Sequence, residues 1–455
     1  MWREAVPLPS APHEPPALVV RGKLPVALIR AIGRWGLTWL VVNAIVGSAV
    51  FGLPTEYVTL LGRASVLAVI VGGLSTAIII ACTAEVASKI PEPGGSYIYA
   101  RTVFGRFAGI QVGWFSWAVR LTATAAGASL FVSYLGGLVP SLEHGWQRAV
   151  VLTLLLGGLT AGNYVGVRSG ANLSSVFAVL KLSLLIALGL YGAVFSGGQG
   201  VPLAMPEIAA PGIKNWFEAL LLLSFMYGGF ETALMPLGEV ENPRRVVPFA
   251  LGVGLALCIA IYSLVQVAVL NTLSAQSSAR PLAVVASTLF GPLGAVATDL
   301  GAMVCIYGYL SASVLGSPRL AYALAEKGDF PPFLATLHPR FKTPHRSIVL
   351  FGLCTWAIAV TGSFRAALAL SIGARLVTYG TTCAALIPLR HYHPGRRGFT
   401  IPFGPVLSVL GVSMTLVLVT RMHQREVIVL AVTGLIAALN WWWVSRHSGI
   451  RGAPG

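Results

Sequence analysis

The chain has 455 residues, of which 56% are hydrophobic and only 10% are charged, and its mean hydropathy is +0.78. This composition excludes an ordinary soluble protein and indicates a polytopic membrane protein. The net charge of +16 is explained by basic loops beside anionic lipids, so it gives no argument for binding nucleic acid.

The first 34 residues carry several charges and a proline-rich stretch from Pro7 to Pro16. They lack the apolar core of a cleavable signal peptide and predict a short cytoplasmic tail. Apolar runs of about 17 or more residues, each long enough to cross a bilayer, follow near residues 35–61, 64–88, 107–138, 148–164, 171–196, 216–238, 247–270, 292–317, 347–362, 366–388, 404–421 and 426–445. They predict an all-α protein with twelve transmembrane helices, because the alternation of a transmembrane barrel is absent.

Basic residues favour one orientation of these helices. With the tail inside, 21 of the 31 lysines and arginines lie in cytoplasmic segments and seven lie outside. The other three, Arg120, Lys181 and Arg375, fall inside predicted helices. Because connections rich in Lys and Arg stay in the cytoplasm, the sequence predicts that both termini are cytoplasmic, with residues 447–455 as the C-terminal tail.

Two predicted helices, the first and the sixth, contain glycine-rich interruptions. The first holds Gly47, Ser48 and Ala49, and the sixth holds Gly228 and Gly229. The interruptions are five helices apart, so the two elements cross the membrane in opposite senses, as in an inverted repeat. Unwinding at mid-membrane depth frees amides that suit a carboxylate and carbonyls that suit an ammonium. A zwitterionic amino acid satisfies both; the alternative is that the glycines only allow close packing of helices.

Lys181 lies in the middle of the apolar run 171–196. At roughly 15 Å from the nearer end of its helix, its side chain cannot snorkel to the interface. It must meet a buried partner or a water-filled cavity, which predicts an ion, proton or substrate pathway.

The remaining residues offer little for other chemistry. All five cysteines lie in apolar helices, where packing is their ordinary role, and the eight histidines lie in tails and connections without metal-ligand spacing. GxxxxGK[ST] and HExxH patterns are absent. The sequence therefore disfavours an ATP-driven pump, a membrane metalloprotease or any other enzyme, and we expect no metal and no cofactor.

Four segments carry a family resemblance: GSAVFGLP from Gly47, PEPGGSYIYA from Pro91, SFMYGGFETALMPLGEVENPRR from Ser224, and SPRLAYALAEKGDFPPFLATLHPR from Ser317. Together with the helix pattern, the chain resembles the amino acid, polyamine and organocation permeases. The resemblance implies the LeuT-like five-plus-five inverted repeat, with repeats at 35–196 and 216–388 and two further helices at 402–446. It also implies secondary active transport of amino acids or related amines.

The resemblance also implies a binding site at the interruptions. The substrate carboxylate would meet Ser48 and the Ala49 amide beside Gly47. The amine would meet carbonyls near Ile45 and in the stretch from Phe225 to Gly228, with Phe225 or Tyr227 as a lid. The family usually has a second glycine where this chain has Ala49, which adds a methyl group beside the carboxylate.

Charged residues receive roles from the same resemblance. The ammonium of Lys181 would stand in for the sodium ion that sodium-coupled relatives bind between the first and eighth helices, and Ser311 and Ser313 are the residues of the eighth helix expected to face it. Alternatively, Lys181 forms a fixed structural ion pair and does not exchange its proton. Glu231 matches a position linked to gating or proton coupling; alternatively, it caps the second half of its helix. Arg120 and Arg375 stay charged and are expected to be fixed partners of carboxylates such as Glu231 or Asp299, or of helix C-terminal carbonyls.

The sequence as a whole predicts a proton-coupled permease that imports amino acids across the cytoplasmic membrane. An exchanger of amines or polyamines is an alternative, and a sensor that binds amino acids without translocating them is another. The connection from Val139 to Gln147 has no cysteine, whereas the disulfide-linked exchangers that the chain resembles need one there. We therefore expect no covalently attached heavy subunit.

Overall fold

The computed structural model describes residues 32–92, 94–166, 170–195, 211–235, 237–272, 278–392 and 398–448. Most of the predicted N-terminal tail, the connection near 197–210 and the end of the C-terminal tail lie outside these residues. Within the described part the secondary structure is helical, apart from one isolated bridge between Ile32 and Val240.

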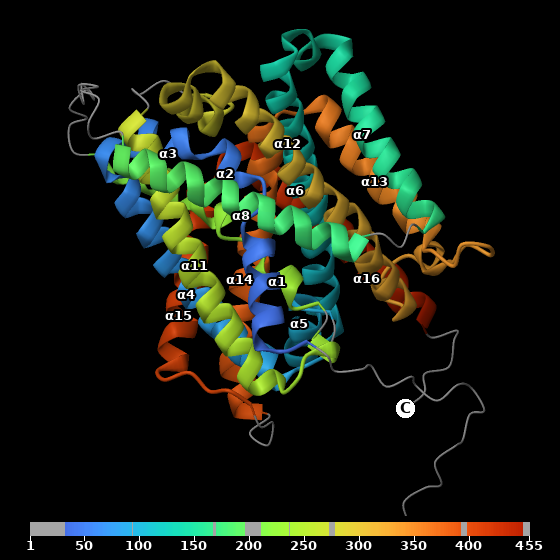
Figure 1. The fold of residues 1–455 in the computed structure, drawn as a ribbon. Helices are drawn as coiled ribbons and strands as arrows, with labels where there is room; N and C mark the ends of the chain where they lie inside the picture. The colour runs from blue at the N-terminus through green and yellow to red at the C-terminus, as the bar shows by residue number, and fades with distance from the viewer. Residues whose placement is uncertain are drawn as a thin grey trace, which may run out of the picture.

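The helices follow the apolar runs of the sequence, with polar or glycine-containing segments between them (Figure 1). The first eight are α1 (Arg34–Ile45), α2 (Ala49–Gly52), α3 (Pro54–Leu61), α4 (Ser65–Lys89), α5 (Ser96–Phe104), α6 (Arg106–Leu138), α7 (Gly145–Val165) and α8 (Gly170–Phe195). The second eight are α9 (Ile213–Met226), α10 (Phe230–Ala233), α11 (Pro243–Thr272), α12 (Pro281–Glu326), α13 (His345–Thr361), α14 (Phe364–Tyr392), α15 (Gly404–Thr420) and α16 (Gln424–Ser448).

Among the described residues, eight helical segments are long and apolar enough to cross a membrane. Many of their apolar side chains point outwards: Leu154 of α7 is 71% exposed and Leu293 of α12 is 82% exposed. Such surfaces suit lipid rather than water. The chain is thus a polytopic, all-helical membrane protein.

The α12 helix differs from its prediction, because it begins at Pro281 and not near residue 292. Gly291 interrupts it with a φ of 71°, a conformation that favours glycine. Pro292 then starts the second part of the helix, where its missing amide hydrogen costs nothing. A short helix before the kink therefore precedes the span that the sequence predicted.

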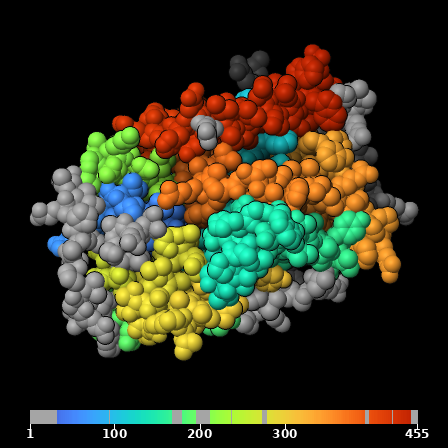
Figure 2. Space-filling view, turned by 90° about the horizontal axis from the view of Figure 1, so that it is seen from above, coloured from blue at the N-terminus to red at the C-terminus, as the bar shows by residue number. Residues whose placement is uncertain are grey.

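Helices α7 and α13 lie side by side and antiparallel at the edge of the molecule (Figures 1 and 2). Near one end of the pair, Thr343 donates a hydrogen bond to the carbonyl of Tyr164 at 2.8 Å. Near the other end, Arg148 donates to the carbonyl of Gly362 at 3.1 Å. The buried core lies beside this pair and is shared by helices α1, α6, α11, α12 and α14. The helix interruptions lie in this core.

Candidate functional site

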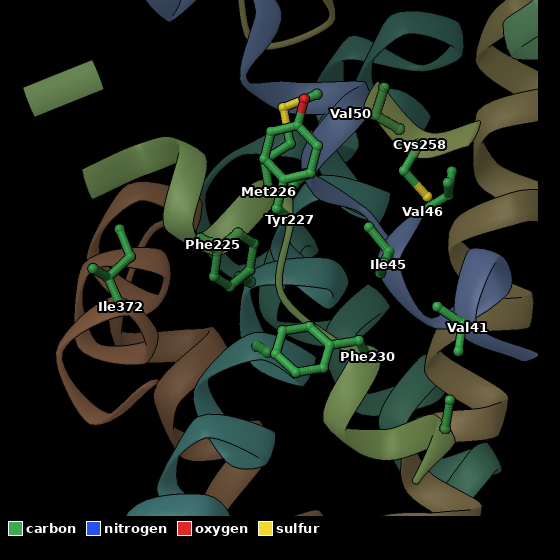
Figure 3. Close-up of a cluster of buried hydrophobic side chains, with 14 of the residues drawn as sticks. Val41, Ile45, Val46, Val50, Phe225, Met226, Tyr227, Phe230, Cys258 and Ile372 are labelled. Atoms are coloured by element: carbon green, nitrogen blue, oxygen red, sulfur yellow. The ribbon is translucent and has the colours of Figure 1, made fainter. Parts of the chain in front are cut away.

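The interruptions of the first and sixth predicted helices meet in the core. The α1 helix ends at Ile45 and α2 starts at Ala49, while α9 ends at Met226 and α10 starts at Phe230. Figure 3 shows side chains of the second interruption beside the first. Gly229 has a φ of 113°, and a Cβ there would collide with the carbonyl oxygen of Ala44. Glycine is therefore required for the two interruptions to approach.

Backbone groups in the first interruption fall into two sets. The Ile45 carbonyl accepts hydrogen bonds from the Gly47 amide at 2.7 Å and from the Tyr262 hydroxyl at 2.9 Å, so both of its lone pairs are used. The amides of Ser48 and Ala49 find no acceptor among the described residues. This interruption therefore offers donors to a ligand, whereas the carbonyl expected to hold an amine already has protein partners.

In the second interruption, the Phe225 carbonyl accepts the Gly228 amide at 3.1 Å, and the Met226 carbonyl accepts the Tyr262 hydroxyl at 3.2 Å. The Gly228 carbonyl receives no hydrogen bond from a described residue. It is left available to a donor such as an ammonium.

A cavity of about 690 Å³ lies against both interruptions and extends along α12 to Arg319 and Lys327. Twelve of the residues that the sequence singled out line it: Ile45, Gly47, Ser48, Ala49, Arg120, Lys181, Phe225, Gly228, Gly229, Glu231, Ser313 and Arg375. Tyr227, Ser311 and Asp299 do not line it.

Lys181 of α8 is 4% exposed and joins α8 to the first interruption. Its ammonium donates hydrogen bonds to the Asn43 side-chain oxygen at 2.8 Å and to the Asn43 carbonyl at 3.1 Å. It also donates to the Val46 carbonyl. These bonds satisfy the ammonium's three donors and replace helical hydrogen bonds that Asn43 and Val46 lack where α1 ends.

The described hydrogen bonds of Lys181 include neither Ser311 nor Ser313. Ser313 instead shares a hydrogen bond of 2.6 Å with Thr124 of α6. Cys305 is the α12 residue that lines the cavity within electrostatic range of the lysine. Ser311 follows Cys305 by six positions, which is about 9 Å along the helix axis. Ser311 therefore lies beyond the part of α12 that is nearest to the lysine.

Tyr227 is fully buried and points away from the cavity. Its hydroxyl donates to the Val69 carbonyl of α4 at 2.9 Å, and its ring lies 5.2 Å from that of Tyr262. Phe225, the other expected lid, does line the cavity. The Arg375 guanidinium lies 5.2 Å from the Phe225 ring centroid, which is cation–π distance.

Glu231 joins the second interruption to α14. Its carboxylate accepts the Gly229 amide at 2.9 Å and the Tyr379 hydroxyl at 3.1 Å. Arg375 lies 3.6 Å from the other carboxylate oxygen and fills the space that a Cβ at Gly228 would need. Glu231 is thus both a backbone cap and the partner of Arg375.

The partner of Asp299 is Arg280, at 2.8 Å. The sequence offered Asp299 to Arg120 or Arg375, so this pairing is a correction. Arg280 lies just before α12 and folds back onto it across the Gly291 kink, which the sequence alone did not reveal. Arg120 has no ion pair with any described residue, although it lies within electrostatic range of Glu231, Tyr309 and Arg375.

Sequence reasoning missed Asn43, which accepts a hydrogen bond from Lys181 near the end of α1. It also missed Tyr262, which donates to the carbonyls at the ends of α1 and α9. Asn43 carried a signal, because it is a polar amide inside an apolar run. The sequence also missed Asp329, which is buried and accepts the hydroxyl of Tyr97, a cavity-lining residue, at 2.5 Å. Within the described residues, no group of three His, Cys, Asp or Glu side chains could hold a metal ion.

Known proteins are similar to this chain over most of its length. The model of the amino acid permease family matches residues 32–444. The serine/threonine exchanger SteT of Bacillus subtilis is 27% identical over 400 residues, which cover 85% of this chain and 89% of the relative. The branched-chain amino acid permease BcaP of the same species is 25% identical over 449 residues, covering 93% and 94%.

An uncharacterized transporter of Mycobacterium tuberculosis is 29% identical over 374 residues, which cover 80% of this chain and 82% of the relative. The family match spans most of the chain and includes both interruptions and the cavity between them. The chain therefore belongs to the amino acid permease family and is a transporter of the bacterial cell membrane, not an enzyme.

Proposed function

We propose that this permease imports an amino acid together with a proton, by alternating access to the cavity between the interrupted helices. The observation that carries the proposal is that the cavity wall holds backbone donors on one side and a backbone acceptor on the other. Among the described residues, the amides of Ser48 and Ala49 find no acceptor on one side, and the Gly228 carbonyl finds no donor on the other. A substrate with a carboxylate and an ammonium on one carbon satisfies both sets.

In the proposed complex, the α-carboxylate binds the Ser48 and Ala49 amides beside Gly47, and the α-amine binds the Gly228 carbonyl. The Ile45 carbonyl positions Tyr262 and does not bind the amine itself, because its lone pairs are used. Phe225 lies at the cavity wall, with its ring 5.2 Å from the Arg375 guanidinium, and acts as the lid. Burying the bound zwitterion in this way removes water from its charged groups and strengthens their hydrogen bonds.

Proton coupling is assigned to Lys181. The charged ammonium holds the α1 end of the first interruption through Asn43 and Val46. If the lysine releases its proton, it loses charge-assisted hydrogen bonds, so the interruption is held less firmly and its helix can move. Because Cys305 and Lys181 share the cavity wall, a proton can reach the amine through water in the cavity. Glu231 is the second candidate for the coupled proton.

The same proposal includes the architecture expected for alternating access. Twelve spans form inverted repeats at 35–196 and 216–388, with a further pair of helices at 402–446, and both tails lie in the cytoplasm beside anionic lipids. The matched positions of the two interruptions support this repeat. With that orientation, the cavity extends towards the cytoplasm at Arg319 and Lys327. The transporter works without a disulfide-linked subunit.

Purified protein in proteoliposomes tests the proposal. Uptake of a panel of labelled amino acids is measured with and without an inward proton gradient. We expect at least one amino acid to accumulate only with the gradient, and its decarboxylated amine to compete poorly. Equal competition by the amine would move the assignment to an amine exchanger. Binding without any uptake or counterflow would indicate a sensor.

A further inference from the structure

The cavity wall has an unusual charge balance. Five cationic side chains line it: Arg120, Lys181, Arg319, Lys327 and Arg375. Glu231 is the only carboxylate among the described lining residues. An amino acid with a neutral side chain carries no net charge and would leave this excess unchanged. Arg319 and Lys327 are exposed, whereas Lys181 and Arg375 are buried and Arg120 is partly buried. Positive charge that is shielded from water and has no partner is costly, so this part of the cavity favours a ligand that brings an additional negative charge.

Four of the five cations have partners in the protein. Lys181 is bonded to Asn43 and Val46, and Arg375 is paired with Glu231. At the end of α12, Arg319 donates to the Leu315 carbonyl. Lys327 lies 5.6 Å from the centroid of the Tyr97 ring.

Arg120 is different. It projects from the middle of α6, on the face where Ser116 and Ala123 also line the cavity. Its guanidinium has no hydrogen bond or ion pair with a described residue, although its backbone carbonyl accepts the Thr124 hydroxyl at 2.6 Å. Glu231 lies within electrostatic range but is already engaged by the Gly229 amide, Tyr379 and Arg375.

The surroundings of Arg120 suit a carboxylate. Tyr309 lines the cavity within electrostatic range of Arg120. The Ser313 hydroxyl also lines the cavity, but it donates to Thr124 at 2.6 Å, because the Thr124 hydrogen goes to the Arg120 carbonyl. A guanidinium binds a carboxylate through two parallel hydrogen bonds, and the Tyr309 hydroxyl can donate a further bond.

We propose that the substrate is an amino acid with a carboxylate side chain, and that Arg120 binds that carboxylate. This inference rests on the proposed function, because the α-carboxylate and α-amine keep their places at Ser48, Ala49 and Gly228. The bound side-chain carboxylate supplies the counter-charge that Arg120 lacks. A cavity of about 690 Å³ has room for it, since ligand sites of 300–1,000 Å³ hold small molecules.

The test compares acidic substrates with their neutral amides, which have nearly the same shape. Labelled L-glutamate and L-aspartate are offered to wild-type proteoliposomes with L-glutamine, L-asparagine, L-serine and L-leucine as competitors. We expect glutamate or aspartate to bind at least about tenfold more tightly than its amide, because a buried guanidinium discriminates strongly between charge and no charge. Ligand-dependent stabilisation of the purified protein against heat gives an independent binding measurement.

The Arg120→Gln variant should lose this preference, with at least about a tenfold rise in the half-saturating concentration of the acidic substrate and little change for the amide. Arg319→Gln is the matched control, because it also removes a positive charge from the cavity wall but should preserve the preference. Arg120→Lys should retain part of it, since one donor cannot reproduce bidentate binding.

Equal binding of glutamate and glutamine by the wild-type protein would overturn the assignment of Arg120, while uptake of a neutral amino acid would still support the proposed function. Equal loss of preference in Arg120→Gln and Arg319→Gln would also overturn it, because general electrostatic attraction would then be the cause. Failure of every amino acid to bind would contradict the proposed function itself.

Discussion

The ammonium of Lys181 donates a hydrogen bond to the carbonyl of Val46, the first residue after α1 ends. Helix α8 contributes no backbone group to the candidate substrate site. Through Lys181 it nevertheless holds the first interruption, whose amides face the cavity. Proton loss at this lysine would change the hydrogen bonding of the substrate site directly, without a chain of intermediate residues. The arrangement gives proton coupling a short physical route.

We predict that Lys181→Ala abolishes accumulation driven by a proton gradient. The change leaves the Asn43 and Val46 carbonyls without their donor, which costs about 1–3 kcal/mol for each group that stays buried and unpaired. Lys181→Arg keeps the charge but cannot release a proton, so it should permit binding and exchange without gradient-driven uptake. Proteoliposome uptake across a range of pH gradients measures both effects.

Lys214→Ala is the control for this prediction, because Lys214 is an exposed lysine at the start of α9 and its removal should leave uptake unchanged. Full accumulation by Lys181→Ala with an unaltered pH profile would assign the proton to another group. Glu231 would then be tested first.

Two substitutions around Glu231 should separate its ion pair from its hydrogen bonds. Glu231→Gln leaves Arg375 buried without a counter-charge, and we expect a loss of about 3 kcal/mol or more in stability. Tyr379→Phe removes one hydrogen bond to the same carboxylate and should cost about 1 kcal/mol. Thermal unfolding in detergent checks the order of the two variants. A larger loss for Tyr379→Phe would mean that the Arg375 pair contributes little.

Ala49 tests the position of the carboxylate site. It is 3% exposed and lines the cavity beside Ser48. Ala49→Gly opens the approach to the amides and should keep or increase uptake, whereas Ala49→Val should weaken substrate binding by about 1–3 kcal/mol through overpacking. Half-saturating substrate concentrations measure this difference. Complete loss of uptake in Ala49→Gly, with the protein still folded, would place the carboxylate elsewhere.

Sequence patterns located the interruptions because glycine and its neighbours are local features. Gly47 and Gly228 both lie where the backbone leaves the helix. The depth of Lys181 in its apolar run also required only residue counting. These local signals identified part of the cavity lining, including Glu231 and Arg375, but most of the residues that line the cavity were not named by the sequence.

Partners were harder to predict, because they depend on how helices rotate and kink against one another. Asp299 pairs with Arg280 only because α12 bends at Gly291. Tyr227 turns towards α4 although its neighbour Gly228 faces the cavity, since an unwound segment has no fixed periodicity. Spacing along α8 likewise does not show which helix binds Lys181, and the first helix was expected only from the family resemblance.

Membrane orientation gives the last prediction. In a variant whose five natural cysteines are replaced, His144→Cys and Leu337→Cys place single thiols at exposed sites on the connections after α6 and α12. The contact pattern of the antiparallel α7 and α13 puts these connections at opposite ends of the pair, because residue 144 precedes α7 and residue 337 precedes α13.

In intact cells, an impermeant thiol reagent should label position 144 and not position 337. Both positions should be labelled after the membrane is permeabilised, which controls for reactivity. Labelling of position 337 alone in intact cells would invert the orientation, and the cationic end of the cavity at Arg319 and Lys327 would then face outwards.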